Sequence, residues 1–533
     1  MTQSQICKFY DGQHVFITGG NGFIGKILVE KLLRSTNVAI IYLLMRTKKG
    51  KDVYTRLEEL LKNEIFNELK EQDADFKRRI QVIVGDNTLP NLGISISDYQ
   101  TLISKVNIVF HVAATVRFQE EIKFAYDTNV GMTMAVIDLC KQMKNIKSFM
   151  YVSTAYSNCY LQNIDEVFYD NLGFDYKEVR SILNEPDGPE KLTRKILQKW
   201  PNTYSFTKAL AELVIKDFAN NLPTGIFRPS IVISTYKEPL EGWTDSLGGP
   251  NILVATIASG FLRFFCCDVR FVVDLVPVDM SVAALLASAW DVHQNYKQGQ
   301  NNIPIYNYVS SVDNPITYDE FIKLNVMVHT ERYPFNNCLW TPRATVLRRS
   351  TIVNFLLNTT YHYLPALLVD AVSVLCFKKP RMISKYRKFN TSRYQMEYFM
   401  AHEWTFTNTN VKTIWNKMNE ADKAIFPFDL KPFNWILYFR NYFKGIRSYL
   451  AKEPWQNLVS ARIKAKRLKI AHQLLLFIIY FIGMTIFYKI LQKTIPLRDL
   501  VRYVLFERSR KKKEECLNLL IAGFNFGEVE GGT

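Results

Sequence analysis

A tyrosine and a lysine with the spacing of one helix face, Tyr204 and Lys208, carry the strongest chemical signal in the sequence. Residues four apart lie side by side on a helix, so the phenol and the ammonium group are expected to be neighbours. A nearby ammonium group lowers the pKa of a phenol because it favours the phenolate. Such a tyrosine can give a proton to an alkoxide that forms during a reaction.

Two hydroxyl side chains end an apolar segment upstream of this pair. Residues 149–156 read FMYVSTAY, a strand-like run that ends in Ser153 and Thr154. A hydroxyl group at the end of such a strand can hold the same substrate oxygen that Tyr204 protonates. We therefore expect Tyr204, Lys208 and a hydroxyl from Thr154 or Ser153 to form one catalytic group.

A glycine-rich turn near the N-terminus predicts the element that binds a nucleotide. An apolar strand, the turn GGNGFIG and an amphipathic helix follow one another in residues 15–33. Gly19 permits the tight turn, Gly22 lets the backbone approach a pyrophosphate, and Gly25 lets the helix pack close to the strand. The helix N-terminus also offers N–H groups to phosphate oxygens. The predicted cofactor contacts in this turn are Thr18, Gly19, Gly20, Asn21, Gly22, Phe23, Ile24 and Gly25.

The end of the next apolar strand, residues 40–45, indicates which cofactor is used. Enzymes that use NAD usually carry an acidic residue here that binds the ribose 2′-hydroxyl. This chain has Arg46, whose guanidinium can pair with a 2′-phosphate, so the sequence favours NADPH. Later strand ends supply Asp86, which could accept from an adenine amino group, and the small Ala113 and Ala114, against which the cofactor can lie.

His111 lies inside the apolar strand that leads to Ala113. A histidine in such a strand is more often packed and hydrogen-bonded than catalytic. We therefore expect a structural role for it.

Taken together, these motifs resemble the extended short-chain dehydrogenase/reductases, and most of all the fatty acyl-CoA reductases. The resemblance covers most of residues 10–450. The segments that carry it are TGGNGFIG (18–25), VFHVAATVRF (109–118), YVSTAYSN (151–158), YSFTKALAE (204–212), FRPSIV (227–232) and DLVPVDM (274–280).

The resemblance implies an α/β fold: a Rossmann-type, doubly wound parallel sheet with a substrate subdomain, then a mostly helical C-terminal domain and a membrane-associated tail. It implies an NADPH-binding and catalytic domain over residues 10–330 and a helical domain over 350–450. In such families Pro229 follows a strand that borders the nicotinamide, and the catalytic strand-end hydroxyl corresponds to Thr154, with Ser153 as the alternative.

The resemblance also implies a reaction. A fatty acyl-CoA would be reduced by NADPH to a primary alcohol and free coenzyme A, by two hydride transfers through an aldehyde. Tyr204 and Thr154 would hold the oxyanion, while Lys208 would bind the ribose. Two rival functions remain: another membrane-bound extended reductase of the hydroxysteroid type, and a catalytically silent protein that binds nucleotides or lipids.

Two segments leave structural alternatives open. A charged, amphipathic insert over residues 165–199 separates Thr154 from Tyr204, and it is either a surface lobe near the substrate or a purely structural insertion. Residues 352–377 are apolar but contain several polar residues, which disfavours a membrane span. An amphipathic helix at a membrane interface and a channel-lining helix are both consistent with this pattern.

The formal charge of +17 is concentrated toward the C-terminus. Residues 461–533 hold 14 Lys and Arg against 6 Asp and Glu, and no zinc-finger, RNP or basic-zipper motif is present, so a nucleic-acid partner is not expected. Within the predicted tail, residues 462–533, the segment 470–488 has 19 residues without formal charge. At about 1.5 Å per residue it reaches roughly 28 Å, which is marginally enough to span a bilayer. Basic residues on both sides leave a single span and a re-entrant anchor open.

The remaining expectations concern compartment and partners. The first 14 residues lack the apolar run of a secretory signal, and the eight cysteines are scattered without metal-ligand spacing. We therefore expect a cytosolic catalytic domain, free thiols and no bound metal. The endoplasmic reticulum membrane is favoured, with the peroxisomal membrane as the alternative. The expected partners are a fatty acyl-CoA and membrane lipid, and a homo-oligomer is left open.

Overall fold

The computed structural model describes residues 3–48, 50–86, 89–342, 345–347, 351–494 and 497–524. The chain divides into two compact units, Met1–Arg462 and Ile463–Thr533. The first unit contains every predicted catalytic and cofactor-binding residue, and the second unit belongs to the predicted tail.

A seven-stranded parallel sheet forms the centre of the first unit, in the order β11-β7-β5-β4-β1-β2-β3. The strands are β1 (His14–Thr18), β2 (Ile40–Met45), β3 (Ile80–Val84), β4 (Ile108–His111), β5 (Ser148–Val152), β7 (Thr224–Pro229) and β11 (Ile305–Tyr308). Phe16 of β1 pairs with Tyr42 on one side and with Val109 on the other. The chain moves outward from β1 to β3 and then returns to β4, so the strand order reverses between β1 and β4. This is the doubly wound topology that the sequence predicted.

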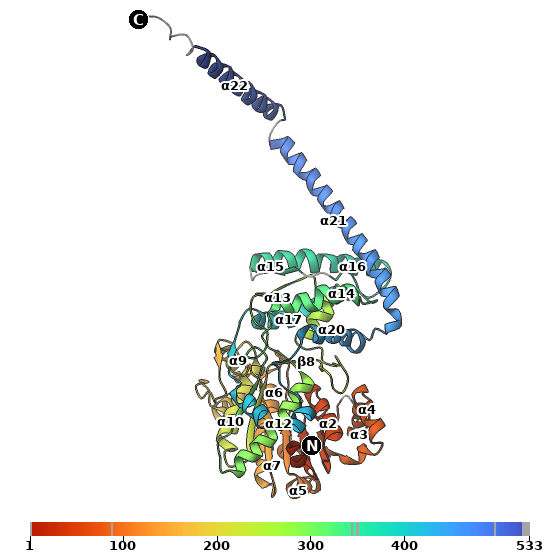
Figure 1. Cartoon of the computed structure of the whole chain (residues 1–533), viewed down its shortest axis with the longest axis vertical. Coiled ribbons are helices and arrows are strands. Elements are labelled where there is room, and N and C mark those ends of the chain that lie inside the picture. Colours follow the sequence, from red (N-terminus) through yellow and green to blue (C-terminus); the bar gives the residue numbers. More distant parts are fainter. Residues whose placement is uncertain are drawn as a thin grey trace, which may run out of the picture. The chain divides into compact units, whose positions relative to one another are not determined.

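Helices cover both faces of this sheet (Figure 1). One layer contains α2 (Phe23–Ser35) and α12 (Val278–Lys297), which contact each other, and the other contains α7 (Met132–Gln142) and α10 (Thr203–Phe218). The strands are apolar on both faces because both are buried, as is usual for parallel sheets. β5 illustrates this, since all five of its residues are buried.

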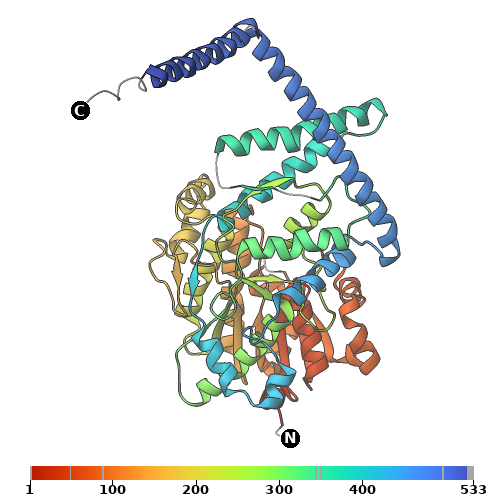
Figure 2. The same cartoon turned by 45° about the horizontal axis from the view of Figure 1, so that its top comes forward.

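The C-terminal helices pack against this α/β core within the same unit. They are α15 (Thr351–Leu357), η6 (Asn358–Tyr363), α16 (Leu364–Leu375), α17 (Met382–Met400), α18 (Thr409–Lys417), α19 (Glu420–Ile425) and α20 (Trp435–Gly445). α18 contacts both α12 and β11. α15 and α16 lie at the opposite end of this unit from α5 (Ile96–Lys105) and α7 (Figures 1 and 2). The predicted boundaries at 330 and 350 stay a prediction, because both parts share one compact unit.

The segment between Thr154 and Tyr204 contains β6 (Asn163–Ile164), which directly precedes the insert 165–199, and then α8 (Tyr176–Leu183) and α9 (Gly188–Ile196) of the insert itself. β6 pairs in parallel with β13 (Thr405–Phe406), which follows α17. The carboxylate of Glu166 accepts hydrogen bonds from the backbone N–H groups of Asn307 and Asn410, at 3.1 and 2.8 Å. The insert therefore ties the C-terminal helices to the edge of the sheet.

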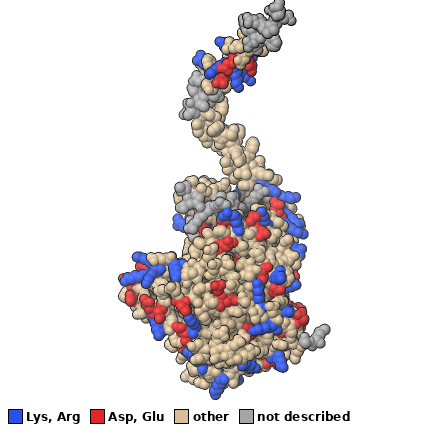
Figure 3. Space-filling view, turned by 60° about the vertical axis from the view of Figure 1, so that its left-hand side comes forward, with Lys and Arg blue, Asp and Glu red and all other residues tan. Residues whose placement is uncertain are grey.

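The second unit consists of helical tail. α21 (Leu458–Thr494) begins just before the unit boundary, and α22 (Leu497–Phe524) follows it. In the described part of the chain, one helix, Trp455–Leu491, is long and apolar enough by length and composition to cross a membrane, and it contains the predicted segment 470–488. Figure 3 shows a stretch of this tail without charged residues, followed by a cluster of charged ones. The predicted tail continues to residue 533, and residues 525–533 lie outside the described range.

Candidate active site

The glycine turn has the shape that a dinucleotide requires. Gly19 has a φ of +78°, and a Cβ built there would lie 2.6 Å from the backbone nitrogen of Ala113, so only glycine fits between the ends of β1 and β4. A Cβ at Gly25 would collide with the carbonyl oxygen of Gly19. Gly22 is the N-cap of α2, and no side chain caps this helix end. The N-terminus of α2 can therefore receive phosphate oxygens, at the point where the strand order reverses.

A buried chain of hydrogen bonds fixes the ends of β1 and β4. The backbone N–H of Ala113 donates to the Thr18 hydroxyl at 3.3 Å, and this hydroxyl lies 2.6 Å from Nδ1 of His111. On the other side of the ring, Nε2 lies 3.0 Å from the hydroxyl of Thr133, which itself donates to the carbonyl oxygen of Asn129. The Thr133 hydroxyl must therefore accept from Nε2–H, which leaves Nδ1 to accept from Thr18.

Burial lowers the pKa of His111 to about 3, and the positive charge of Lys208 acts in the same direction. The ring is therefore neutral at physiological pH and holds the strand ends together. This agrees with the structural role that the sequence indicated for His111.

Two arginines meet beyond the end of β2. Arg46 follows this strand directly, and Arg56 of α3 (Val53–Leu61) donates a hydrogen bond to the Arg46 carbonyl oxygen. Burial lowers the pKa of Arg56, and the positive charge of Arg46 lowers it further. The carboxylate of Glu59 opposes this shift, and the two positive charges make this strand end a candidate site for an anion. Arg56 was not predicted from the sequence. Asp86 follows β3, and its backbone N–H donates to the Leu92 carbonyl oxygen at 2.7 Å.

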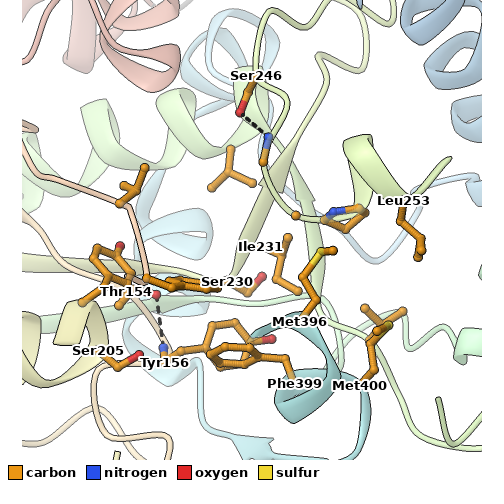
Figure 4. A pocket seen from close by; sticks show the side chains of 18 of the residues that line it. Thr154, Tyr156, Ser205, Ser230, Ile231, Ser246, Leu253, Met396, Phe399 and Met400 are labelled. Carbon is orange, nitrogen blue, oxygen red and sulfur yellow. Dashed lines mark hydrogen bonds between the residues drawn. The ribbon is translucent and has the colours of Figure 1, made fainter. Parts of the chain in front are cut away.

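Tyr204 and Thr154 line one cavity of about 270 Å³ at the carboxyl edge of the sheet. Figure 4 shows Thr154 among the residues of its wall. Its wall is mainly apolar and includes Val116, Phe118, Tyr156, Ile231, Leu253, Phe321, Met396, Phe399 and Met400. The hydroxyls of Thr154, Tyr204, Ser205 and Ser230 belong to residues of the same wall. Within the described part of the chain, the lining contains no residue of the insert 165–199, which favours a structural role for the insert.

Tyr204 stays protonated in this arrangement. Burial raises the pKa of Tyr204 to about 12, and a hydrogen bond with the Thr154 hydroxyl partly offsets the rise. The sequence predicted that Lys208 would lower this pKa, but Lys208 is not among the groups that shift it. Nζ of Lys208 instead donates to the carbonyl oxygen of Val152 at 2.7 Å and lies 4.5 Å from the centre of the Tyr151 ring. Burial lowers the pKa of Lys208 itself to about 7, while the carboxylate of Glu212 raises it.

The two strand-end hydroxyls have different surroundings. Thr154 lines the cavity, and its Oγ1 accepts from the backbone N–H of Tyr156 at 3.2 Å, which leaves its own proton for another acceptor. Ser153 instead donates to Glu212, whose carboxylate also forms a fully buried ion pair with Arg228 at 2.6 Å. Of the two predicted candidates, Thr154 is therefore the one placed to act on a molecule in the cavity.

Ser230 was missed by the sequence reasoning, although it directly follows the predicted Pro229. The carbonyl oxygen of Pro229 accepts from the N–H of Ala155 at 2.9 Å, so the residues after β7 lie beside those after β5. Ser230 is only 6% exposed and lines the cavity, and its hydroxyl has no hydrogen-bond partner among the described residues. A buried hydroxyl without a partner costs stability, which points to a ligand that completes it.

The C-terminal helix α17 was also missed as part of the site. Met396, Phe399 and Met400, at its C-terminal end, line the same cavity as Ser230 (Figure 4). These residues are about 190 positions from Tyr204 or more, and no local pattern marks them.

The chain is an NAD(P)-dependent oxidoreductase of the short-chain dehydrogenase/reductase type. The features that define this class are the doubly wound sheet, the glycine turn at its switch point and the Tyr-x-x-x-Lys helix beside a strand-end hydroxyl. Two family models, both described as "Male sterility protein", match residues 17–285 and 361–453. They correspond to the α/β part and to the helices that follow it.

Comparison with known proteins places the chain more closely. "Fatty acyl-CoA reductase wat" from Drosophila melanogaster is 40% identical over 492 residues, which is 92% of this chain and 94% of the relative. "Fatty acyl-CoA reductase 2" from Homo sapiens is 34% identical, over 88% of this chain and 91% of the relative. The chain belongs to the fatty acyl-CoA reductase family.

Solved structures support the fold. The reductase domain of a nonribosomal peptide synthetase from Mycobacterium tuberculosis has a TM-score of 0.53 and 17% identity, covering 83% of this chain and 92% of that domain. The terminal reductase domain of the myxalamid pathway has a TM-score of 0.51 and 18% identity, covering 82% and 90%.

Proposed function

We propose that this protein reduces fatty acyl-CoA thioesters to primary alcohols, with NADPH as the reductant and an aldehyde as the intermediate. The observation that carries the proposal is that Tyr204 and Thr154 line one apolar cavity, at the same edge of the sheet as the glycine turn. The fatty acyl-CoA reductases to which the chain is similar support the acyl-CoA substrate.

The cavity wall supports an acyl chain as the bound group. Apart from a few hydroxyls, the lining is aliphatic and aromatic, and Met396 and Met400 contribute flexible side chains that adapt to irregular shapes. Each buried methylene of a chain gains about 0.8 kcal/mol on leaving water. A catalytically silent protein, one of the two rivals, would not require the Tyr204–Thr154 pair.

The cofactor proposal rests on Arg46 and Arg56. Their mutual repulsion would be relieved by a 2′-phosphate, which NADPH carries and NADH lacks. Gly19, Gly22 and the N-terminus of α2 would hold the diphosphate, while Ala113 and Pro229 would flank the rest of the molecule. When bound, the nicotinamide supplies the hydride.

The residues of the chain handle the oxygen and the protons. The Thr154 and Tyr204 hydroxyls donate to the thioester carbonyl oxygen and stabilise the negative charge that develops on it. Tyr204 is protonated below its pKa of about 12, so it can pass its proton to that oxygen and give a hemithioacetal. Loss of coenzyme A as the thiol leaves an aldehyde, and a second hydride and proton give the alcohol. Lys208 is assigned to the ribose.

The helix Trp455–Leu491 fits membrane association. We propose the endoplasmic reticulum as its membrane, with the catalytic unit in the cytosol. The peroxisomal membrane is the alternative.

Product stoichiometry tests the proposed function. The purified full-length protein is incubated with palmitoyl-CoA and NADPH, and aldehyde, alcohol, free coenzyme A and oxidised cofactor are quantified. The proposal predicts hexadecanol, with one coenzyme A released and two NADPH oxidised for each alcohol. Reduction of a ketosteroid without reduction of palmitoyl-CoA would instead identify a hydroxysteroid-type enzyme, and NADPH binding without turnover of either would identify a silent protein.

A further inference from the structure

Helix α16 has the reverse of the usual pattern for a helix on a protein surface. Ala366 and Asp370, a small residue and a charged one, are its buried positions, at 1% and 6% exposure. The large aliphatic side chains point to solvent, and most of them are more than half exposed: Leu364, Leu367, Leu368, Val369, Val372, Val374 and Leu375. A water-soluble surface rarely carries so continuous an apolar patch, so this face is expected to meet an apolar partner.

The apolar surface continues on both sides of α16. Before it, Phe355 of α15 is 70% exposed, and after it Phe377 is fully exposed. Phe377 occupies the turn that ends α16 with a φ of +55°, a conformation that favours glycine. A bulky aromatic residue at such a position costs free energy in water, and burying its ring elsewhere would offset that cost.

The turn between α16 and α17 is held firmly. The buried carboxylate of Asp370 accepts hydrogen bonds from the backbone N–H groups of Arg381, Met382 and Ile383, at 2.8 to 3.0 Å. The N–H of Lys378 donates to the carbonyl oxygen of Ser373 at 2.8 Å. Asp370 therefore caps the start of α17 from α16, so the two helices present Phe377 on a fixed tip.

The residues next to this tip are strongly basic. The exposed cations are Lys378, Lys379, Arg381, Lys385, Arg387 and Lys388. Residues 371–396 contain no Asp or Glu, so no acidic side chain of this segment balances them. An apolar surface edged by lysine and arginine matches the interface of a bilayer with anionic headgroups, where the apolar groups enter the acyl region and the cations remain at the headgroups.

We propose that α16, the tip at Phe377 and the basic start of α17 form a docking surface for an anionic lipid bilayer, separate from the helix Trp455–Leu491. In this arrangement α16 lies in the plane of the membrane and its leucines enter the headgroup boundary. A second copy of the chain is a poor occupant, because two such surfaces would bring the same cations together. Among the described residues, the cavity lining takes nothing from 352–377, so the channel-lining alternative is not supported.

Docking there would bring the acyl cavity close to the lipid. α17 leads from the docking surface at Met382 to the cavity at Met396, a distance of about 21 Å at 1.5 Å per residue. This consequence rests on the proposed function. The docking itself does not, so it is tested without an activity measurement.

The native Cys376 reports on the docking directly. Among the eight cysteines, only Cys376 and Cys516 are exposed, so the full-length Cys516→Ser variant can be labelled at Cys376 with an environment-sensitive fluorophore. The protein is reconstituted into phosphatidylcholine vesicles with and without phosphatidylserine. The control is the Cys376→Ser/Cys516→Ser variant with Glu71→Cys, an exposed site on α4 (Asn67–Gln72).

We expect a blue-shifted emission at Cys376, with quenching by brominated lipid rather than by aqueous iodide, and a stronger effect with phosphatidylserine. The Glu71→Cys label should remain quenched by iodide. A Cys376 label that behaves like the Glu71→Cys label would overturn the proposal. Self-quenching at Cys376 that disappears as protein is diluted in lipid would do so too, because it would identify a second copy as the occupant.

A charge-reversal pair separates the basic edge from a general effect of charge. The Lys378→Glu/Lys379→Glu/Arg381→Glu variant should lose the phosphatidylserine-dependent part of the blue shift. The matched control, with the same change in net charge at exposed or half-exposed sites, is Lys62→Glu/Lys70→Glu/Arg78→Glu, and it should retain that part. Equal losses in both variants would contradict a specific basic edge.

Discussion

Ser153 and Thr154 are consecutive in the chain, yet their hydroxyls serve different parts of the molecule. Thr154 lines the cavity with Tyr204, whereas Ser153 donates to Glu212 in a buried ion pair with Arg228. Both residues directly follow β5, and their hydroxyls have different neighbours. Thr154 thus belongs to the candidate active site, and Ser153 belongs to the buried hydrogen-bond network of Glu212 and Arg228.

Alanine substitution at these two positions should have separable effects. Thr154→Ala removes a donor to the developing oxyanion, so kcat should fall about 100-fold or more while the melting temperature stays close to that of the wild type. Ser153→Ala removes a buried partner of Glu212 and should cost about 1–3 kcal/mol of stability, with a smaller effect on kcat. Steady-state kinetics and thermal melts of both variants give the comparison. If the variants exchange these phenotypes, Ser153 is the catalytic hydroxyl.

Ser230 should show a trade-off between stability and activity. Ser230→Ala removes a buried hydroxyl without a partner in the described structure, so the melting temperature should be unchanged or raised. If that hydroxyl binds the substrate, kcat/KM for the acyl-CoA should fall roughly two- to tenfold. Ser148→Ala is the matched control, because Ser148 on β5 is also buried without a partner and lies outside the cavity lining. A loss of activity at Ser148 equal to that at Ser230 would refute the assignment.

Cofactor selection should depend on the two arginines beyond β2. We expect Arg46→Ala and Arg56→Ala each to raise the KM for NADPH about 10- to 100-fold, since each removes a charged partner of the 2′-phosphate. The KM for NADH should change little. Arg78→Ala, at an exposed surface arginine, serves as the control. Equal effects on both cofactors at Arg46 would show that it does not contact the 2′-phosphate.

Lys208 should make stability depend on pH in a predictable direction. Its pKa is lowered from 10.5 to about 7 by burial, so between these values the unfolded chain binds more protons than the folded one. Stability therefore rises with pH across this window, and the burial penalty is felt in full below pH 7.

Lys208→Met removes this titration while keeping most of the side-chain volume. The stability of the wild type relative to Lys208→Met should therefore increase as the pH rises from about 7 to about 10.5. The buried tyrosines titrate in both proteins, so their contribution cancels when the stability of Lys208→Met is subtracted from that of the wild type. Melts of both proteins over this range test the prediction, and a constant difference would mean that Lys208 keeps an ordinary pKa in the folded protein.

Much of the site could be predicted from the sequence because its signals are local. The glycines from Gly19 to Gly25 lie within seven consecutive residues. Tyr204 and Lys208 are four residues apart on one helix. Doubly wound topology follows from alternating strands and helices, since parallel neighbours require crossovers. The register then brings the ends of β1, β4, β5 and β7 to the same edge.

The rest could not be predicted because it depends on tertiary contacts. Met396, Phe399 and Met400 reach the cavity only because α17 folds back over the sheet. The choice between Ser153 and Thr154 as the catalytic hydroxyl depends on where Glu212 lies, because Ser153 donates to it. The raised pKa of Tyr204 depends on how deeply the phenol is buried, and Lys208 does not offset that rise. The apolar pattern of residues 352–377 is equally consistent with a buried channel and an exposed face, and only the exposed fractions of α16 separate them.

The central claim is that Tyr204 protonates the oxygen of a reduced acyl group. The direct test compares the products of the wild type and Tyr204→Phe from palmitoyl-CoA and NADPH, with NADPH binding and the melting temperature measured for both. We expect Tyr204→Phe to form neither aldehyde nor alcohol above background, while it still folds and binds NADPH. Alcohol formation by this variant at a rate near that of the wild type would contradict it.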